Sequence, residues 1–196
     1  MQIIILKTNY KTVMLFVIFE NTKMKYTMQK IPEVWLRGPL PNVPDLLQPA
    51  AHALLQAQEE INELMKNFDE QLLWKRIAGQ ASVAFHLQHI PGVQNRLFSY
   101  AKGEMLTEQQ LEYLRNEGQQ NNSITVGLLL DHLNKQTEGS VKQLQQMDIA
   151  TLTDTREVGR KKIPSTVLGL LFHAAEHTMR HTGQLLVTVN FLNADI

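Results

Sequence analysis

The chain contains no cysteine among its 196 residues. This absence excludes disulfide bonds, zinc sites built from thiolates, iron–sulfur clusters and a cysteine nucleophile. Any metal ion must therefore be bound by histidine, aspartate or glutamate. This ligand set suits zinc, nickel, iron, manganese or copper, and it discriminates little among them.

The chain also lacks an excess of charge of either sign. Lys+Arg and Asp+Glu each number 19, so the formal net charge is zero. No global electrostatic attraction to nucleic acid or to an anionic membrane surface follows from such a balance. The short basic run of Arg160, Lys161 and Lys162 is interpreted as a solvated loop. We therefore expect neither nucleic acid nor a membrane as a partner.

The chain also lacks a long apolar run near its start. The run VMLFVIF at residues 13–19 has seven residues, whereas a membrane-spanning helix needs about 20. Residues 1–28 differ from the rest and have three interpretations: an over-extended start, a β-like tail, or an export signal. We favour the first, with the functional chain beginning near Met24 or Met28, and expect the protein to be cytoplasmic.

Prolines set the next boundary. Five of the seven prolines fall between Pro32 and Pro49. Proline fixes φ and has no amide donor, so it disfavours a helix interior. This composition predicts an extended, Pro-rich leader over residues 29–45, followed by one domain over residues 46–196.

Four long segments carry apolar residues at intervals of three and four, the period of an amphipathic helix. They cover residues 50–68, 81–101, 123–147 and a last segment that starts at 164–166 and ends near 191. A short helix is expected within residues 103–120, where Thr107 and Gln110 form a capping box. We find no alternating strand pattern. The sequence therefore predicts an all-α four-helix bundle with a long crossover connection after the second helix.

Five of the seven histidines fall in two of these helices: His86 and His89 in the second, His173, His177 and His181 in the last. Helix residues four apart lie on one face, so the last three can point in a similar direction. A lone histidine on a helix is usually solvated or hydrogen-bonded. Three on one face, with a second pair on another helix, leave two interpretations open: a metal site, or a structural bundle with fortuitous histidines.

Two motifs are similar to those of the DinB/YfiT-like family. His177, His181, Gly183 and Gln184 match its H-x-x-x-H-x-G-Q element, and SVAFHLQHI at residues 82–90 resembles its second-helix element. The resemblance covers residues 32–192. It implies a DinB-like four-helix bundle that holds one divalent metal ion through His89, His177 and His181. Zinc is the first choice of metal, and nickel, iron or manganese are alternatives.

Other residues can support these ligands without binding the metal. His86, His173 and Gln184 are candidates for hydrogen bonds near the site, and Glu176 could orient a ligand imidazole. The alternatives are a packed core histidine for His173 and a surface ion pair for Glu176. Gly183 is interpreted as a position of close helix approach. Pro91 predicts a bend in its helix just after His89.

The resemblance implies a metal-dependent enzyme, a hydrolase or a thiol S-transferase, that acts on a small molecule. The alternative is a non-catalytic metal-bearing protein with a stress-response or binding role. Three protein ligands leave open coordination positions for water or substrate. A low-molecular-weight thiol, if used, must be a cosubstrate because the chain has no cysteine. The resemblance also implies a homodimer, and no catalytic residue beyond the ligands is identified.

Overall fold

A computed structural model of the chain describes residues 7–8, 11–12 and 31–194. The apolar run at residues 13–19 and the alternative starts at Met24 and Met28 lie outside these residues. The chain divides into two compact units, Met1–Pro32 and Glu33–Ile196. In the first unit, β1 (Lys7–Thr8) and β2 (Lys11–Thr12) form an antiparallel pair. The second unit carries the predicted helices.

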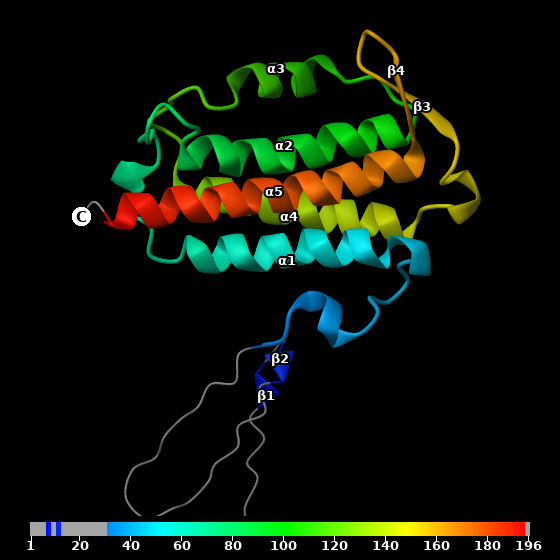
Figure 1. Cartoon of the computed structure of the whole chain (residues 1–196), viewed down its shortest axis with the longest axis horizontal. Coiled ribbons are helices and arrows are strands. Elements are labelled where there is room, and N and C mark those ends of the chain that lie inside the picture. The colour runs from blue at the N-terminus through cyan, green and yellow to red at the C-terminus, as the bar shows by residue number, and fades with distance from the viewer. Residues whose placement is uncertain (1–6, 9–10, 13–30, 195–196) are drawn as a thin grey trace, which may run out of the picture. The chain divides into compact units, whose positions relative to one another are not determined.

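Helices make up most of the second unit (Figure 1). In chain order they are α1 (Gln48–Leu64), α2 (Val83–Ala101), α3 (Glu108–Asn116), α4 (Val126–Gln145) and α5 (Val167–Ala194). α2 continues as one helix through Pro91. α3 begins with the predicted capping box of Thr107 and Gln110. Among the described residues, no helix is both long enough and apolar enough to cross a membrane.

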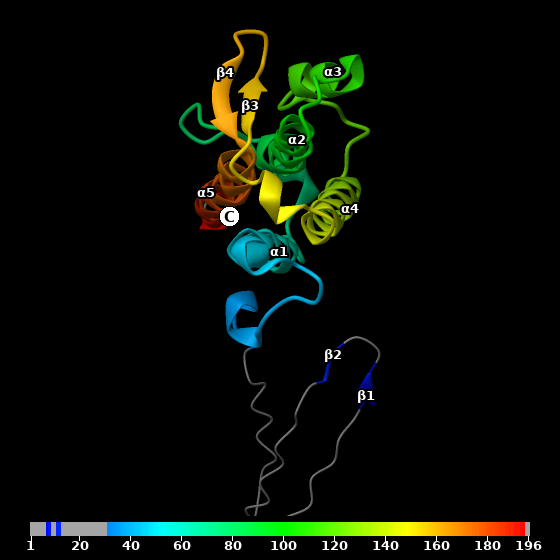
Figure 2. The same ribbon diagram turned by 90° about the vertical axis from the view of Figure 1, so that its right-hand side faces the viewer.

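The four long helices form the predicted bundle. α5 packs against α1 and α2, and α4 packs against the same two helices, so α1 and α2 lie on one diagonal (Figure 2). α2 and α5 run antiparallel, because His86 lies opposite His181 and His89 opposite His177. α2 and α4 run in the same direction (Figure 1). The segment that contains α3 must therefore run back along the bundle from the end of α2 to the start of α4. This path confirms the predicted crossover connection.

The bundle core consists of two apolar clusters separated by a polar layer. One cluster includes Leu47, Leu54 and Val167, and the other includes Ile61, Leu87 and Leu185. The polar layer between them is built on Gln94, which is fully buried. The side chain of Gln94 bonds to hydroxyl groups of α4 and α5 at 3.2–3.4 Å, those of Thr137, Ser140 and Thr178. Each buried polar group of this layer thus finds a partner.

The Pro-rich leader contains helical turns that the sequence analysis did not predict. Two 3-10 helices, η1 (Val34–Arg37) and η2 (Asp45–Leu47), interrupt its extended backbone. The prolines prevent a continuous α-helix here, but single 3-10 turns need too few hydrogen bonds to be blocked by them. The backbone N–H of Val34 donates to Gln56 Oε1 at 2.8 Å, which fixes the leader to α1.

The second unit also contains a short hairpin that the sequence analysis did not predict. β3 (Thr155–Val158) and β4 (Ile163–Thr166) form an antiparallel hairpin, with Val158 opposite Ile163. Gly159 follows β3 with a φ of +67°, a conformation that glycine adopts easily at a turn. The basic run Arg160–Lys162 therefore lies in the turn of this hairpin. Two short 3-10 helices, η3 (Glu70–Leu72) and η4 (Ile149–Thr151), complete the connections.

The start of the last helix also differs from the prediction. Pro164 lies in β4, and α5 begins only at Val167. Proline is compatible with an edge strand because its missing donor need not bond to a neighbour. The helix start is instead marked by Thr166, whose Oγ1 accepts a hydrogen bond from the N–H of Gly169 at 3.0 Å.

Candidate metal centre

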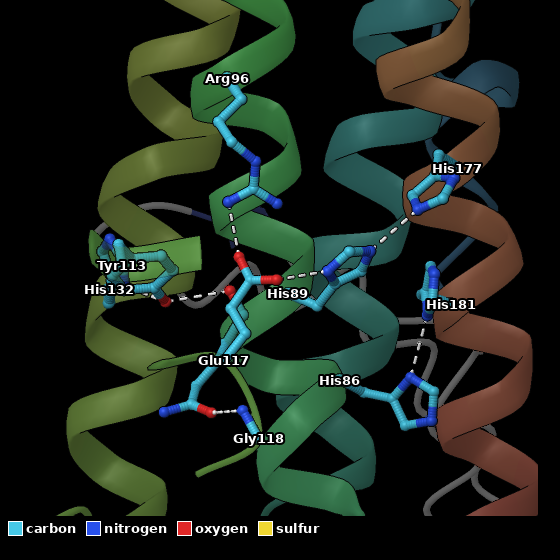
Figure 3. Close-up of polar contacts among 10 residues, drawn as sticks. His86, His89, Arg96, Tyr113, Glu117, Gly118, His132, His177 and His181 are labelled. Carbon is cyan, nitrogen blue, oxygen red and sulfur yellow. Dashed lines mark hydrogen bonds and ion pairs between the residues drawn. The ribbon is translucent and has the colours of Figure 1, made fainter. Parts of the chain in front are cut away.

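Three histidines from two helices meet between α2 and α5. His89 projects from α2, and His177 and His181 project from consecutive turns of α5 (Figure 3). The Nε2 atoms of His89 and His177 are 3.0 Å apart. One ring nitrogen from each of the three histidines lies within 4.8 Å of the other two. The structure thus brings together the three residues that the resemblance implied as ligands, in a cluster that could bind a metal ion.

The environment of this cluster favours neutral imidazole rings. Burial, and after it the neighbouring His89, lower the pKa of His177 to about 4 and that of His181 to about 3. Imidazole must be neutral to bind a metal ion, so both rings are ready to bind at neutral pH. Two nitrogens bound tetrahedrally to one zinc ion lie about 3.3 Å apart. The observed 3.0 Å is close to this separation, and the residues present fit a divalent metal ion.

A carboxylate supports His89 on the side away from α5. One oxygen of Glu117 lies 2.6 Å from His89 Nδ1, and its other oxygen accepts a hydrogen bond from Arg96 Nη1 at 2.6 Å (Figure 3). The side chains of Glu117 and Arg96 are only 3% and 9% exposed. A carboxylate behind the imidazole is the usual support of a metal-binding histidine.

Sequence analysis missed Glu117, which lies just after α3 in a connection with no recognisable motif. The available signal was indirect. Arg96 follows His89 by seven residues, two helical turns, and so lies on the same face of α2. A largely buried arginine on that face needs an acidic partner, but the sequence does not show which acid supplies it.

His86 contacts a second histidine of the cluster. Its Nδ1 lies 3.0 Å from Nδ1 of His181, and its ring is almost fully buried. Burial lowers the pKa of His86 to about 4. This contact leaves Nε2 of His181 available for a metal ion. By contrast, Nδ1 of His177 is buried and has no hydrogen-bond partner among the described residues.

The remaining supporting candidates lie at the surface. His173 is exposed, and its Nδ1 lies 2.7 Å from Glu176 Oε1. Glu176 also accepts two hydrogen bonds from Arg180 at 2.7 Å, the surface ion pair considered as its alternative role. His173, Glu176 and His177 lie close enough to hold a metal ion themselves, so His177 is shared by two possible groups. Gln184 is exposed and makes no side-chain bond to these histidines.

The close approach predicted at Gly183 is found at Gly92 instead. A Cβ atom on Gly183 would meet no atom within 4 Å, so this residue does not mediate a close helix approach. At Gly92, a Cβ atom would lie 2.3 Å from Glu117 Oε1 and 2.8 Å from Tyr113 Cε1. Glu117 can therefore approach His89 only because residue 92 has no side chain.

Further hydrogen bonds fix the α3 segment above α2. The Tyr113 hydroxyl donates to the carbonyl of Gln88 at 3.0 Å, and the N–H of Gly118 donates to Gln88 Oε1 at 2.8 Å. Two cavities lie beside this segment. One, of about 790 Å³, has mainly amide side chains in its wall, and the other, of about 390 Å³, is lined by residues that include Gly92, Arg96 and His132. Neither cavity is lined by a histidine of the cluster.

Comparisons with known proteins agree with this architecture. Residues 53–185, about two thirds of the chain, match the family described as the DinB superfamily. The crystal structure of a conserved protein from Enterococcus faecalis is 16% identical with a TM-score of 0.57, covering 72% of this chain and 94% of that chain. A crystal structure from Streptococcus pneumoniae is 14% identical with a TM-score of 0.57, covering 77% and 91%. These two likenesses show the fold alone. No curated protein matches the chain.

Proposed function

Because the chain belongs to the DinB superfamily, we propose that it binds one divalent transition metal ion, zinc first, and is a metal-dependent enzyme for a small molecule. The proposed ligands are His89, His177 and His181. One observation carries the proposal: three half-buried histidines from two antiparallel helices direct their ring nitrogens at one another. A metal ion would give the ring nitrogens of these half-buried histidines one common partner.

The proposed reaction classes are hydrolysis and thiol S-transfer. A metal ion held by three histidines supplies a Lewis acid with open coordination positions, which can polarise a substrate or lower the pKa of a nucleophile. In this chain His89, His177 and His181 would hold the ion, while Glu117 and His86 orient two of these rings. A thiol nucleophile would have to enter as a cosubstrate, because the chain has no cysteine.

The alternative is a metal-bearing protein without turnover, and one observation favours it. Neither of the two cavities beside α3 is lined by His89, His177 or His181. Neither cavity therefore forms a substrate pocket at the proposed metal site. A binding or stress-response protein needs only the metal site, whereas an enzyme needs room for a substrate at the open coordination positions.

Elemental analysis of the full chain, purified without a histidine tag, tests the metal site. About one equivalent of zinc, nickel, iron or manganese per chain is expected, and a metal-free protein that binds none on titration would contradict the proposal. Turnover is then tested by screening ester and thiol-acceptor substrates with a low-molecular-weight thiol, before and after removal of the metal by a chelator. Metal-dependent turnover supports the enzyme, and its absence in a metal-loaded protein supports the alternative.

A further inference from the structure

We infer that Glu117 is a positioning residue of this site, which fixes the tautomer and the orientation of His89 and thereby sets the metal affinity. This inference rests on the proposed function, because it assigns a role toward the metal ligand His89. Glu117 itself lies too far back to be a ligand of the cluster, since His89 stands between it and His177 (Figure 3).

The first step of the argument is the tautomer of His89. A carboxylate only accepts hydrogen bonds, so the proton between Glu117 and His89 belongs to Nδ1 of the ring. The 2.6 Å distance is that of a charge-assisted hydrogen bond. In the neutral ring the lone pair then lies on Nε2, the nitrogen that faces His177 at 3.0 Å. Glu117 thus presents the donor atom of His89 toward the cluster.

The second step is the charge of Glu117. Its other oxygen is bound by Arg96 at 2.6 Å, and a guanidinium group stays protonated in proteins. Both side chains are at least nine-tenths buried, so water contributes little to holding this carboxylate in place. Arg96 therefore supplies a counter-charge for the buried carboxylate that faces the ring of His89.

The third step is placement. The missing side chain at Gly92 lets Glu117 pass close to α2, and the bond from Gly118 N–H to Gln88 Oε1 fixes the residue that follows it. Gly118 has a φ of +79°, a turn conformation that directs the chain away immediately after Glu117. These independent contacts hold one particular carboxylate against one particular ring.

The three proposed ligands differ in what supports their second nitrogen. His181 is bonded to a neutral histidine, His86, and Nδ1 of His177 has no partner among the described residues. Within the described part of the chain, Glu117 is the one carboxylate hydrogen-bonded to a proposed ligand. Such a bond increases the basicity of the ligand, so His89 should be the strongest donor of the three.

The test measures zinc affinity of the full chain by competition with a chromophoric chelator. We expect Glu117→Gln to weaken zinc binding by roughly 10–100-fold, the usual effect of removing such a support. The matched control is Glu108→Gln, which makes the same chemical change on α3. Glu108 is exposed and pairs with Arg115 at 2.6 Å, away from the histidines. The Glu108→Gln variant should therefore bind zinc with the affinity of the wild type.

A purely structural role would give a different pattern. Arg96→Gln breaks the ion pair but keeps the carboxylate of Glu117 next to His89, so it separates the loss of the ion pair from the loss of the carboxylate. We expect Glu117→Gln to lose more zinc affinity than Arg96→Gln at a comparable unfolding midpoint of the metal-free protein. The visible spectrum of the cobalt-substituted protein should change in Glu117→Gln and remain unchanged in Glu108→Gln.

The double variant of Arg96→Gln with Glu117→Gln covers the case in which the single variant fails to fold. It replaces the buried ion pair by two amides that can bond to each other, and it should show the same loss of affinity. Wild-type affinity and an unchanged cobalt spectrum in a folded Glu117→Gln or double variant would overturn this inference and leave the proposed metal site intact. A wild-type chain that binds no metal would overturn both.

Discussion

Each of the three clustered histidines supplies one of only three protein donors to the proposed ion. His89→Ala, His177→Ala and His181→Ala should therefore each lower metal affinity by more than the roughly 10–100-fold that the loss of a supporting residue costs, and metal occupancy should fall accordingly. The measurement is elemental analysis after dialysis against a fixed concentration of metal. His52→Ala is the control, because His52 lies on α1 and belongs to neither group that could hold a metal ion. His86→Ala should have a measurable effect, since His86 is bonded to His181.

The same experiment distinguishes the two groups that share His177. If His173→Ala removed the metal and His89→Ala left it in place, the site would be formed by His173, Glu176 and His177 on one helix. We expect the opposite result, because Glu176 is already bonded to Arg180 at 2.7 Å and His173 is exposed to water.

Acid should destabilise the metal-free protein through the same residues. Burial lowers the pKa of His86 and His177 to about 4 and that of His181 to about 3, from an ordinary value of 6.5. Between these values the unfolded chain binds more protons than the folded chain, so the free energy of unfolding falls as the pH drops. Stability should be greatest above about pH 6.5 and decline toward pH 4.

Thermal unfolding in the presence of a chelator, measured between pH 7.5 and pH 4, checks this direction. Bound metal should be released over the same acidic range, because protons compete for the ring nitrogens. An unfolding midpoint that stays constant from pH 7 to pH 4.5 would contradict the burial of these rings. In His86→Ala the unfolding midpoint should depend less on pH than it does in the wild type.

How far the site could be predicted depends on the spacing of its residues. His177 and His181 lie four apart on one helix, and this short-range pattern is visible in the sequence. Glu117 is 28 residues from His89 and follows the end of α3. Its contact with His89 results from the path of the crossover connection, which no local periodicity encodes.

At the scale of elements, the docking of α3 on α2 depends on Gly92. We expect Gly92→Ala to destabilise the fold by about 1–3 kcal/mol, the usual cost of overpacking, and to weaken metal binding by displacing Glu117. Denaturant unfolding and zinc competition measure the two effects. Gly139→Ala on α4 is the matched control, because a Cβ atom there meets nothing within 4 Å. That variant should be stabilised by up to about 1 kcal/mol through its helix propensity.

The helices could be predicted from sequence better than their connections. The apolar periodicity of α1, α2, α4 and α5 reflects burial of one face, and burial is what the structure shows. The hairpin β3–β4 could not be predicted in the same way, because its strands have only four residues each and are partly exposed. Pro164 and Thr166 are typical of a helix start, and here only Thr166 serves as one.

At the scale of the whole molecule, the resemblance predicts a homodimer. α5 presents large apolar side chains to solvent, including Phe172, Val187 and Phe191, which are 65%, 54% and 58% exposed. Such side chains are typical of surfaces that associate. Light scattering should give twice the chain mass at micromolar concentrations, and Phe172→Glu is the first variant to test for dissociation. A strict monomer over the same range of concentrations would contradict the prediction.

The antiparallel pairing of α2 and α5 also has a kinetic consequence. His89 and His177 are 88 residues apart in the chain, so their approach closes a long loop and is among the contacts that raise the contact order. Contacts of this kind form late, after the local helices. An ion bound there would be absent from the folding transition state, and would slow unfolding while leaving the refolding rate nearly unchanged. The bound ion would thus give kinetic stability to a bundle that folds without it.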